Sequence, residues 1–216
     1  RLYPIIITLY SYIFKYFTKV YTVSKEMKSK LEKIIDSNKI EIYGDTRFDQ
    51  IKYRFSNHNL NRPIFKHSKN ILFGSIDEND IPVIFESLKN DFINLNNPKL
   101  IFVPHEPDSK IISIIETKLM ELSISSIRFT LMDENIDENK FAAIIIDKVG
   151  ILAEAYKFST ISYIGCGFSK GVHNVVEPAM HRNIICFGPN YEILNEADDL
   201  VKKELAFPIS NSKELS

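Results

Sequence analysis

Six short apolar runs, separated by longer amphipathic stretches, constrain the fold of this chain more than any other feature. The runs lack the polar–apolar alternation of half-exposed strands, so they are typical of strands covered on both faces. Helices are expected between them, because apolar side chains recur there at helical spacing. This alternation predicts an α/β fold with a Rossmann-like parallel sheet flanked by helices. The expected strands are 70–75, 99–104, 126–130, 141–147, 160–166 and 183–188, and the expected helices are 79–92, 108–122, 150–158, 174–182 and 191–204.

A shorter pattern of the same kind precedes this region. Residues 19–24 and 39–43 read as strands, and 25–35 reads as a helix whose N-cap would be Ser24. Polar residues rich in asparagine follow, which is typical of a linker. We therefore expect three parts, which are the end of one α/β domain at 1–50, a linker at 51–69 and a second domain at 70–216.

The two ends of the chain carry expectations of their own. The chain starts at Arg1 and stops in a polar stretch after a strand-like run at 206–209, so we expect a piece of a longer protein with a truncated second domain. Residues 5–14 are strongly apolar, but Lys15 and Lys19 interrupt the run before the ~20 residues that a spanning helix needs. No small-residue cleavage site follows, which argues against a signal peptide. We expect a helix buried against another domain, with an interfacial membrane helix as the alternative.

Charge and residue counts exclude several functional classes. The chain has 27 basic and 28 acidic residues and a net charge of -1, so it lacks the basic excess of nucleic-acid-binding proteins and no nucleic-acid partner is expected. Cys166 and Cys186 lie in apolar runs and are expected to be buried thiols of a reduced protein. The five histidines show no paired spacing, so no metal site is expected. The sequence also contains no P-loop and no nucleophile elbow.

The residues that follow each expected strand are the candidates for a site, because ligands of doubly wound sheets bind beyond the carboxyl ends of the strands. Gly74 would let a ligand approach the backbone, and the hydroxyl of Ser75 could bind a phosphate. His105 lies between two prolines that stiffen its loop, and it could donate to an anion. Gly150 opens a helix whose first amides could bind an anion. Ordinary turns and a His–Glu surface pair are the alternatives at these places.

A glycine-rich stretch, GCGFSKGVHNVVEPA at 165–179, follows the fifth expected strand and holds three of the seven glycines of the chain. Gly165, Gly167 and Gly171 leave backbone N–H groups uncovered, so the loop could cradle an oxyanion. Lys170 lies inside the same loop and adds positive charge. These features favour a phosphate site, and a glycine-rich turn is the alternative.

The residues after the glycines extend this interpretation toward a nucleotide. His173 and Asn174 are expected at the start of a helix, where the positive end of the dipole attracts anions. Glu177 lies one turn further on the same face as Asn174. A carboxylate there would suit a ribose, because it can accept hydrogen bonds from two adjacent hydroxyls. Phosphate donors followed by a diol acceptor match the order of groups in a nucleotide, and a simple helix cap is the alternative.

An ordered set of motifs makes the chain resemble the 3-deoxy-D-manno-octulosonic acid (Kdo) transferases, which are GT-B glycosyltransferases of lipopolysaccharide biosynthesis. No single motif is decisive, but their order is specific and covers almost the whole chain. The motifs are GDTRFD at 44–49, GS at 74–75, PHEP at 104–107, DKVGIL at 147–152, the glycine-rich stretch at 165–179 and FGPN at 187–190.

The resemblance implies that this chain is the carboxyl-side half of such an enzyme, with 70–216 as the donor domain and 1–50 as the end of the acceptor domain. It implies CMP-Kdo as the donor substrate, a lipid A precursor as the acceptor, and no metal or other cofactor. It also implies peripheral contact with the bacterial inner membrane, at its cytoplasmic face. The family's catalytic base lies in the amino-terminal domain, so none is expected in this chain and the fragment is expected to be inactive alone.

The resemblance also assigns residues. The matching CMP-binding positions are Ser75, His105, Gly150, Lys170, His173, Asn174 and Glu177, and with Gly74, Gly167 and Gly171 they form the candidate site. The chain departs from the family at Cys166, which replaces the second glycine of a Gly-Gly pair, and at Val172, where many members have glycine. It also has His105-Glu106 where many members have Arg-His, which removes an arginine fork.

Two other functions are compatible with the same residues. One is a GT-B enzyme that uses a UDP-sugar donor, and the other is a non-catalytic nucleotide-binding module. A binding assay that compares CMP with UDP separates the first alternative from the Kdo transferases, and activity of the full-length chain separates the second.

Overall fold

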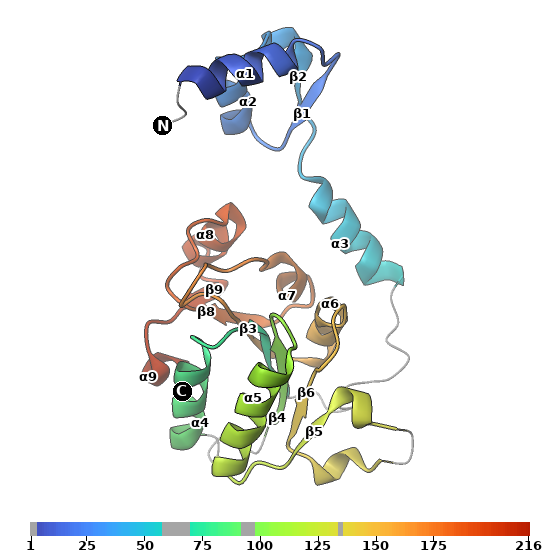
Figure 1. Cartoon of the computed structure of the whole chain (residues 1–216), viewed down its shortest axis with the longest axis vertical. Coiled ribbons are helices and arrows are strands. Elements are labelled where there is room, and N and C mark those ends of the chain that lie inside the picture. The colour runs from blue at the N-terminus through green and yellow to red at the C-terminus, as the bar shows by residue number, and fades with distance from the viewer. Residues whose placement is uncertain (1–3, 58–69, 92–97, 134–135) are drawn as a thin grey trace. The chain divides into compact units, whose positions relative to one another are not determined.

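A computed structural model of the chain describes residues 4–57, 70–91, 98–133 and 136–216. These residues belong to two compact units, which divide between Asn57 and His58. The first unit runs from blue to cyan in Figure 1, and the second runs from green to red.

The described part of the first unit contains a short parallel sheet and three α-helices, which precede, separate and follow its two strands in the sequence. Strands β1 (Val20–Thr22) and β2 (Ile40–Ile42) pair in parallel, with Val20 opposite Ile40. The helix predicted at 25–35 is α2 (Lys25–Leu31), and the expected N-cap is confirmed, because Ser24 Oγ accepts from Met27 N at 3.1 Å. The apolar start forms α1 (Pro4–Phe14), and the third helix is α3 (Thr46–Asn57).

Helix α3 changes the expected boundary between the parts of the chain. Residues 51–57 of the predicted linker at 51–69 are the second half of α3 rather than a coil. The helix was missed because its apolar residues are few and most of its side chains are exposed. Residues 58–69 lie outside the described residues, so the linker stays a prediction there.

The second unit is built on a seven-stranded sheet whose recorded strand pairs are all parallel, in the order β5-β6-β4-β3-β7-β8-β9. All six predicted strands are present, and the strand-like run at 206–209 supplies the seventh at the sheet edge. The sheet strands are β3 (Asn70–Ile76), β4 (Lys99–Pro104), β5 (Ser126–Arg128), β6 (Ala143–Ile145), β7 (Ile161–Ile164), β8 (Ile184–Phe187) and β9 (Ala206–Pro208).

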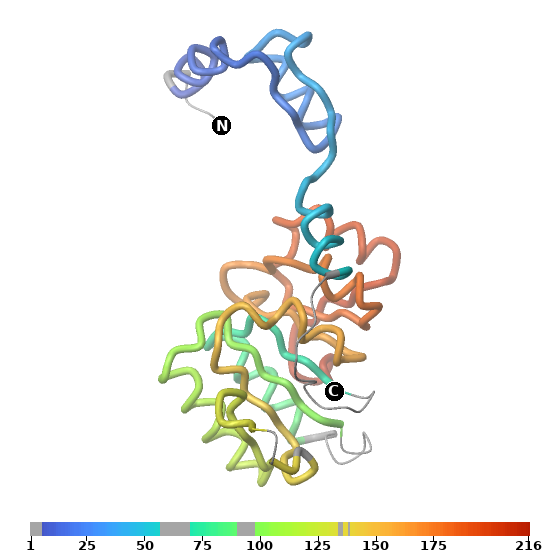
Figure 2. The backbone as a smooth tube through the Cα atoms, turned by 90° about the vertical axis from the view of Figure 1, so that its right-hand side faces the viewer, coloured from blue at the N-terminus to red at the C-terminus, as the bar shows by residue number. Residues whose placement is uncertain are grey.

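Helices cover both faces of this sheet, which explains why its strands are continuously apolar. Phe73, Phe102 and Tyr163 point to one face and pack with α4 (Ile81–Asp91) and α5 (Ser109–Glu121). Their neighbours Leu72, Ile101 and Ile164 point to the other face, where α6 (Leu152–Ala155), α7 (Val176–Met180) and α8 (Asn195–Lys202) pack. Figure 2 follows the same backbone from the side. The predicted α/β fold with a Rossmann-like parallel sheet flanked by helices is confirmed.

Several elements are shorter than predicted. The helix expected at 150–158 is α6 followed by a 3-10 turn at Tyr156–Phe158, and the helix expected at 174–182 is reduced to α7. Helix α8 begins four residues later than the predicted start at 191. A short terminal helix, α9 (Ser212–Leu215), was not predicted. Within the described residues, every helix is too short or too polar to span a bilayer.

Candidate functional site

The order of the strands places a topological switch between β3 and β7. From β3, the chain moves to β4 on one side of β3, and it later returns to β7 on the other side. Connections leave in opposite directions at such a point, so the carboxyl ends of the flanking strands frame a crevice that binds ligands. The segments that leave β4, β3 and β7 at this edge contain most of the predicted site residues.

Two residues at this edge have strained backbone angles. Ser75 and Cys166, at the ends of β3 and β7, have positive φ angles of 57° and 63°. The register between β3 and β4 shifts between Gly74 and Ile76, so Ser75 lies at a bulge. The sulfur of Cys166 donates to the carbonyl oxygen of Ser75 at 3.3 Å, so the two strained residues are in direct contact. Non-glycine residues with such angles cost energy and gather at functional sites.

Three of the predicted residues meet directly. Ser75 Oγ and His105 Nδ1 lie 2.7 Å apart, within hydrogen-bond distance. The imidazole rings of His105 and His173 are stacked, with centroids 5.1 Å apart and planes inclined by 19°. Both histidines are exposed, so their ring nitrogens can donate to an anion from solvent. A hydroxyl and two imidazoles from three separate segments therefore form one polar cluster.

The glycine-rich loop begins with a tight hydrogen-bonded turn over residues 166–171. The carbonyl oxygen of Cys166 accepts from Ser169 N at 3.1 Å and from Gly171 N at 2.8 Å. Lys170 is exposed within this turn, and its positive charge lowers the pKa of Cys166, against the larger effect of burial. The predicted cation is thus present at the loop and close to the end of β7.

Two carboxylates that the sequence analysis missed hold this loop. Asp80 is fully buried and accepts from the Tyr163 hydroxyl at 2.6 Å and from Cys166 N at 2.8 Å. Asp77 accepts from the hydroxyl of Ser169. The signal in the sequence was the acidic run DEND directly after a buried strand, but it could not be told from an ordinary helix cap.

The surroundings shift the pKa values of the two carboxyl groups in opposite directions. Burial raises the pKa of Asp80, although hydrogen bonds from Tyr163, Asp77 and Cys166 oppose that effect. Burial also acts to raise the pKa of Asp77, but hydrogen bonds from Ser169 and Asn79 outweigh it and leave that pKa lowered. Burial raises the pKa of the Cys166 thiol to about 12, with the nearby carboxylates adding to the effect. The thiol is therefore protonated at neutral pH.

Three glycines of the predicted site, Gly74, Gly167 and Gly171, face protein atoms. A Cβ on Gly74 would lie 2.8 Å from the Tyr156 hydroxyl, and a Cβ on Gly167 would lie 2.5 Å from the backbone nitrogen of Gly188. Gly165 has the same reason to be glycine, since a Cβ there would lie 2.4 Å from the carbonyl oxygen of Ser75. These glycines allow strands and loops to approach closely. A ligand contact at Gly74 or Gly167 stays a prediction.

The positions of the other predicted residues give less support for a contact with a ligand. Gly171 has a φ of 103° and Gly150 a φ of 85°, both of which favour glycine, and the space beside Gly150 is open. Asn174 does not leave the start of α7 free for an anion as expected. Its side-chain oxygen accepts from Val176 N at 2.9 Å and from Glu177 N at 3.4 Å, so two amides at the start of α7 are already bonded, although Val175 is the N-cap residue.

Glu177 lies one turn into the same segment, as expected, and it is partly exposed. Burial is the main cause of the raised pKa of the Tyr156 hydroxyl, and the charge of Glu177 adds to this effect. The Tyr156 hydroxyl also lies beside Gly74, near the carboxyl end of β3. A ribose contact by Glu177 stays a prediction.

Among the residues that the structure describes, two groups of side chains have ligand atoms close enough together to hold a metal ion. Ligand atoms of His105, Cys166 and His173 lie within 4.8 Å of one another, and so do those of Asp77, Asp80 and Cys166. The first set fits a soft cation only after the Cys166 thiol loses its proton, which its raised pKa opposes. The second set is occupied by hydrogen bonds from the loop. The predicted absence of a metal cofactor therefore remains our expectation.

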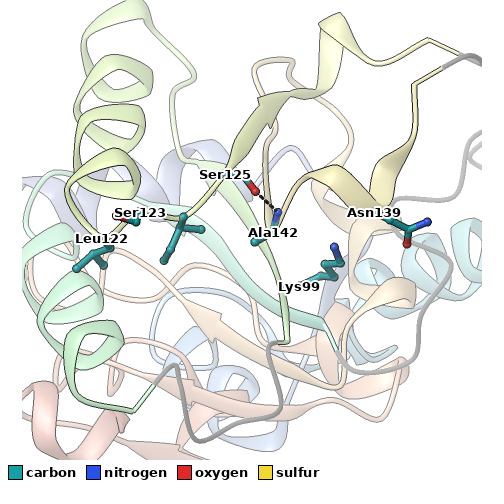
Figure 3. A pocket seen from close by; sticks show the side chains of 7 residues that line it. Lys99, Leu122, Ser123, Ser125, Asn139 and Ala142 are labelled. Atoms are coloured by element: carbon teal, nitrogen blue, oxygen red, sulfur yellow. Dashed lines mark hydrogen bonds between the residues drawn. The ribbon is translucent and has the colours of Figure 1, made fainter.

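A separate cavity of about 410 Å³ lies at the opposite end of the strands, where β4, β5 and β6 begin. Figure 3 shows residues that line it, which include Lys99 at the start of β4, Ser123 after α5 and Asn139. The Lys99 ammonium already donates to the carbonyl oxygen of Phe141 at 2.6 Å. The cavity lies away from the switch point and contains none of the predicted site residues, so we do not place the site there.

The chain is similar in sequence to known glycosyltransferases. No family model matches the chain. A curated 3-deoxy-D-manno-octulosonic acid transferase from Rickettsia prowazekii is 29% identical over 211 residues, which cover 94% of this chain and 44% of the relative. A bifunctional glycosyltransferase/methyltransferase from Fusobacterium nucleatum is 27% identical over 131 residues, covering 60% of this chain and 20% of the relative. The chain thus spans less than half the length of these relatives.

A solved structure supports the fold. The C-terminal CMP-Kdo binding domain of WaaA from Acinetobacter baumannii superposes with a TM-score of 0.59 at 16% sequence identity. The superposition covers 77% of this chain and 83% of that domain. At this identity the match establishes a shared fold. In sequence, the chain is similar to curated Kdo transferases over most of its length, as the ordered motifs predict.

Proposed function

We propose that this chain supplies the CMP-binding half of a glycosyltransferase that moves Kdo from CMP-Kdo to a lipid A precursor. The observation that carries the proposal is the cluster of Ser75, His105 and His173 at the switch point, beside a loop that presents Lys170. Similarity to curated Kdo transferases and the fold of a CMP-Kdo binding domain support the same donor.

The chemistry follows from charge. Departure of CMP leaves negative charge on its phosphate, and the Lys170 ammonium with the imidazole N–H groups would stabilise that charge in a fixed arrangement. The acceptor hydroxyl needs a general base, which we place outside these residues. In this proposal the chain needs no metal, because its own cations and donors meet the phosphate.

The proposal has a location as well. A lipid A precursor is held in a membrane, so this acceptor implies peripheral contact with a membrane, and we propose the cytoplasmic face of the bacterial inner membrane. The exposed apolar side chains of α1, among them Leu9, Tyr12 and Ile13, are compatible with such a contact.

Calorimetric titration with CMP and, separately, UDP tests the nucleotide. We expect selective binding of CMP by the full-length protein. A preference for UDP would move the chain to another GT-B family, and binding of neither nucleotide would refute the proposed site. Transfer of Kdo by the full-length protein would exclude a non-catalytic binding module.

The variant Glu177→Ala tests the ribose contact. A charged hydrogen-bond acceptor is worth about 1.5–3 kcal/mol, so we expect CMP affinity to fall by roughly 10- to 100-fold. Glu121→Ala is the matched control, because Glu121 ends α5 at the opposite edge of the sheet and pairs with Lys118. Equal CMP affinity in both variants would remove Glu177 from the site.

A further inference from the structure

Asp80 lies where an aspartate usually caps a helix, but its carboxylate is used elsewhere. It directly precedes α4, and an N-cap side chain normally accepts from the first amides of its own helix. Here one oxygen accepts from the Tyr163 hydroxyl at 2.6 Å. The other accepts from Asp77 N at 2.9 Å and Cys166 N at 2.8 Å. The carboxylate thus ties the turn after β3 to the loop after β7.

Burial of this carboxyl group also has a cost in stability when the group is ionised. Asp80 is 0% exposed, and burial raises its pKa above the usual value of 3.8. The folded state therefore binds a proton more tightly than the unfolded state, and stability falls as pH rises from 3.8 through the raised folded-state pKa. Ionisation of Asp80 therefore works against stability as pH rises, although the carboxylate accepts hydrogen bonds that an apolar side chain could not accept.

What the carboxylate holds is the first residue of the glycine-rich loop. Cys166 has a φ of 63°, and its amide would be buried without an acceptor if Asp80 were absent. Its carbonyl oxygen accepts from Ser169 and Gly171, so the position of Cys166 sets the turn that presents Lys170. The hydroxyl of Ser169 donates to Asp77, which gives the loop a second link to the turn after β3.

We propose that Asp80, assisted by Asp77, is a positioning residue that fixes the loop 166–171 where it meets the phosphate of the donor nucleotide. This inference rests on the proposed function for its ligand. It predicts that loss of the Asp80 links lowers nucleotide affinity without any contact between Asp80 and the nucleotide.

Two variants of the same carboxylate network separate positioning from general stability. Asp80→Ala removes all three links. Tyr163→Phe removes only the link to β7 and leaves both amides on Asp80. Both variants disturb a buried hydrogen bond, so both lower the melting temperature. Asp80→Asn is the rescue variant, because its amide oxygen can still accept from Cys166 and Asp77 while the Tyr163 hydroxyl turns to accept from the amide nitrogen.

The test measures CMP affinity and amide hydrogen exchange of residues 166–171 in the full-length protein. We expect Asp80→Ala to lose about tenfold in CMP affinity and to exchange faster in the loop. Tyr163→Phe should stay within about twofold of the unchanged protein in affinity, and Asp80→Asn should recover most of it. Equal affinities and equal loop exchange in Asp80→Ala and Tyr163→Phe would overturn the inference.

A second pair keeps the test decisive if Asp80→Ala does not fold. Ser169→Ala removes the link to Asp77, and Ser87→Ala removes a buried hydrogen bond of 2.7 Å within α4. We expect faster loop exchange and several-fold weaker CMP binding only for Ser169→Ala. If the unchanged protein binds no CMP, the proposed function fails, and loop exchange alone then upholds or overturns the positioning role.

Discussion

At the scale of single residues, the strained pair at the switch point is the feature that most needs its surroundings. The other non-glycine residues with positive φ angles, Ser123, Arg182 and Glu204, follow helices, where this conformation is an ordinary end. Ser75 and Cys166 instead end neighbouring strands and contact each other. Their conformation is held by the Asp80 network and by the close approach of Gly165 to Ser75. Strain of this kind marks the site more sharply than the glycines do.

Gly167→Ala tests whether that glycine makes room for protein or for ligand. A Cβ would lie 2.5 Å from the backbone of Gly188, which cannot move as a side chain can. We expect the free energy of unfolding to fall by about 1–3 kcal/mol, measured by denaturant titration. Unchanged stability with weaker CMP binding would show that the space belongs to the ligand.

The two cysteines give a second prediction at this scale. Burial raises the pKa of both Cys166 and Cys186 to about 12. Thiolate, which is the reactive form, should then be about one part in ten thousand at pH 8. We expect thiol reagents to modify both residues only after unfolding. Rapid modification of one thiol in the folded protein would contradict the burial of that residue.

At the scale of elements, an ion pair joins α5 to the edge strand β5. Arg128 Nε and Nη2 donate to Glu116 Oε1 at 2.6 Å and Oε2 at 2.7 Å, a bidentate arrangement. The hydrogen bond from Arg128 lowers the pKa of Glu116 below its usual value of 4.5, against the opposing effect of burial. The pair is 35–38% exposed, so water and salt screen it.

Removal of this pair should therefore have a small and pH-dependent effect. We expect Glu116→Gln to lose about 0.2–1 kcal/mol of unfolding free energy at pH 7. A lowered folded-state pKa gives stability that is present above 4.5 and is lost as pH falls through the lowered value, so the difference should vanish in acid. Denaturant titrations of both proteins across pH measure it. A difference that persists unchanged in acid would exclude the ion pair as its source.

At the scale of the whole molecule, the two units differ greatly in the apolar surface they bury. The described part of the first unit has Ile35 and Ile40 as its buried apolar side chains. The second unit packs two hydrophobic clusters, one on each face of its sheet. Burial of apolar side chains is the main stabilising contribution to folding, so resistance to local opening should differ accordingly.

Hydrogen exchange measures this difference. We expect the amides of β1 and β2 to exchange much faster than those of β3, β4 and β7 in the centre of the large sheet. Denaturant well below the main transition should abolish protection in the first unit alone. Equal protection in both units would show that the first unit draws stability from elsewhere in the full-length protein.

Apolar periodicity was sufficient to predict the strands and most helices of the second unit. Strands such as KLIFVP are buried on both faces, and this requirement is written in local composition. The ends of α6 and α7 were not predictable, because they depend on which turn packs against the sheet. Helix α3 was missed for a related reason, since an exposed helix carries little apolar signal.

The candidate site divides in the same way. Residue types after each strand indicated that Ser75, His105 and the glycine-rich loop belong to one edge, because parallel strands end together. The strand order was not in the sequence, and only this order makes β3 and β7 neighbours and brings Asp80 to Cys166 across 86 positions. The roles of Gly74 and Gly167 likewise depended on close approaches between distant segments, whereas Asn174 bonds amides two and three residues further along the chain. Local composition specifies which segments are buried, whereas contacts between segments arise from packing of the whole chain.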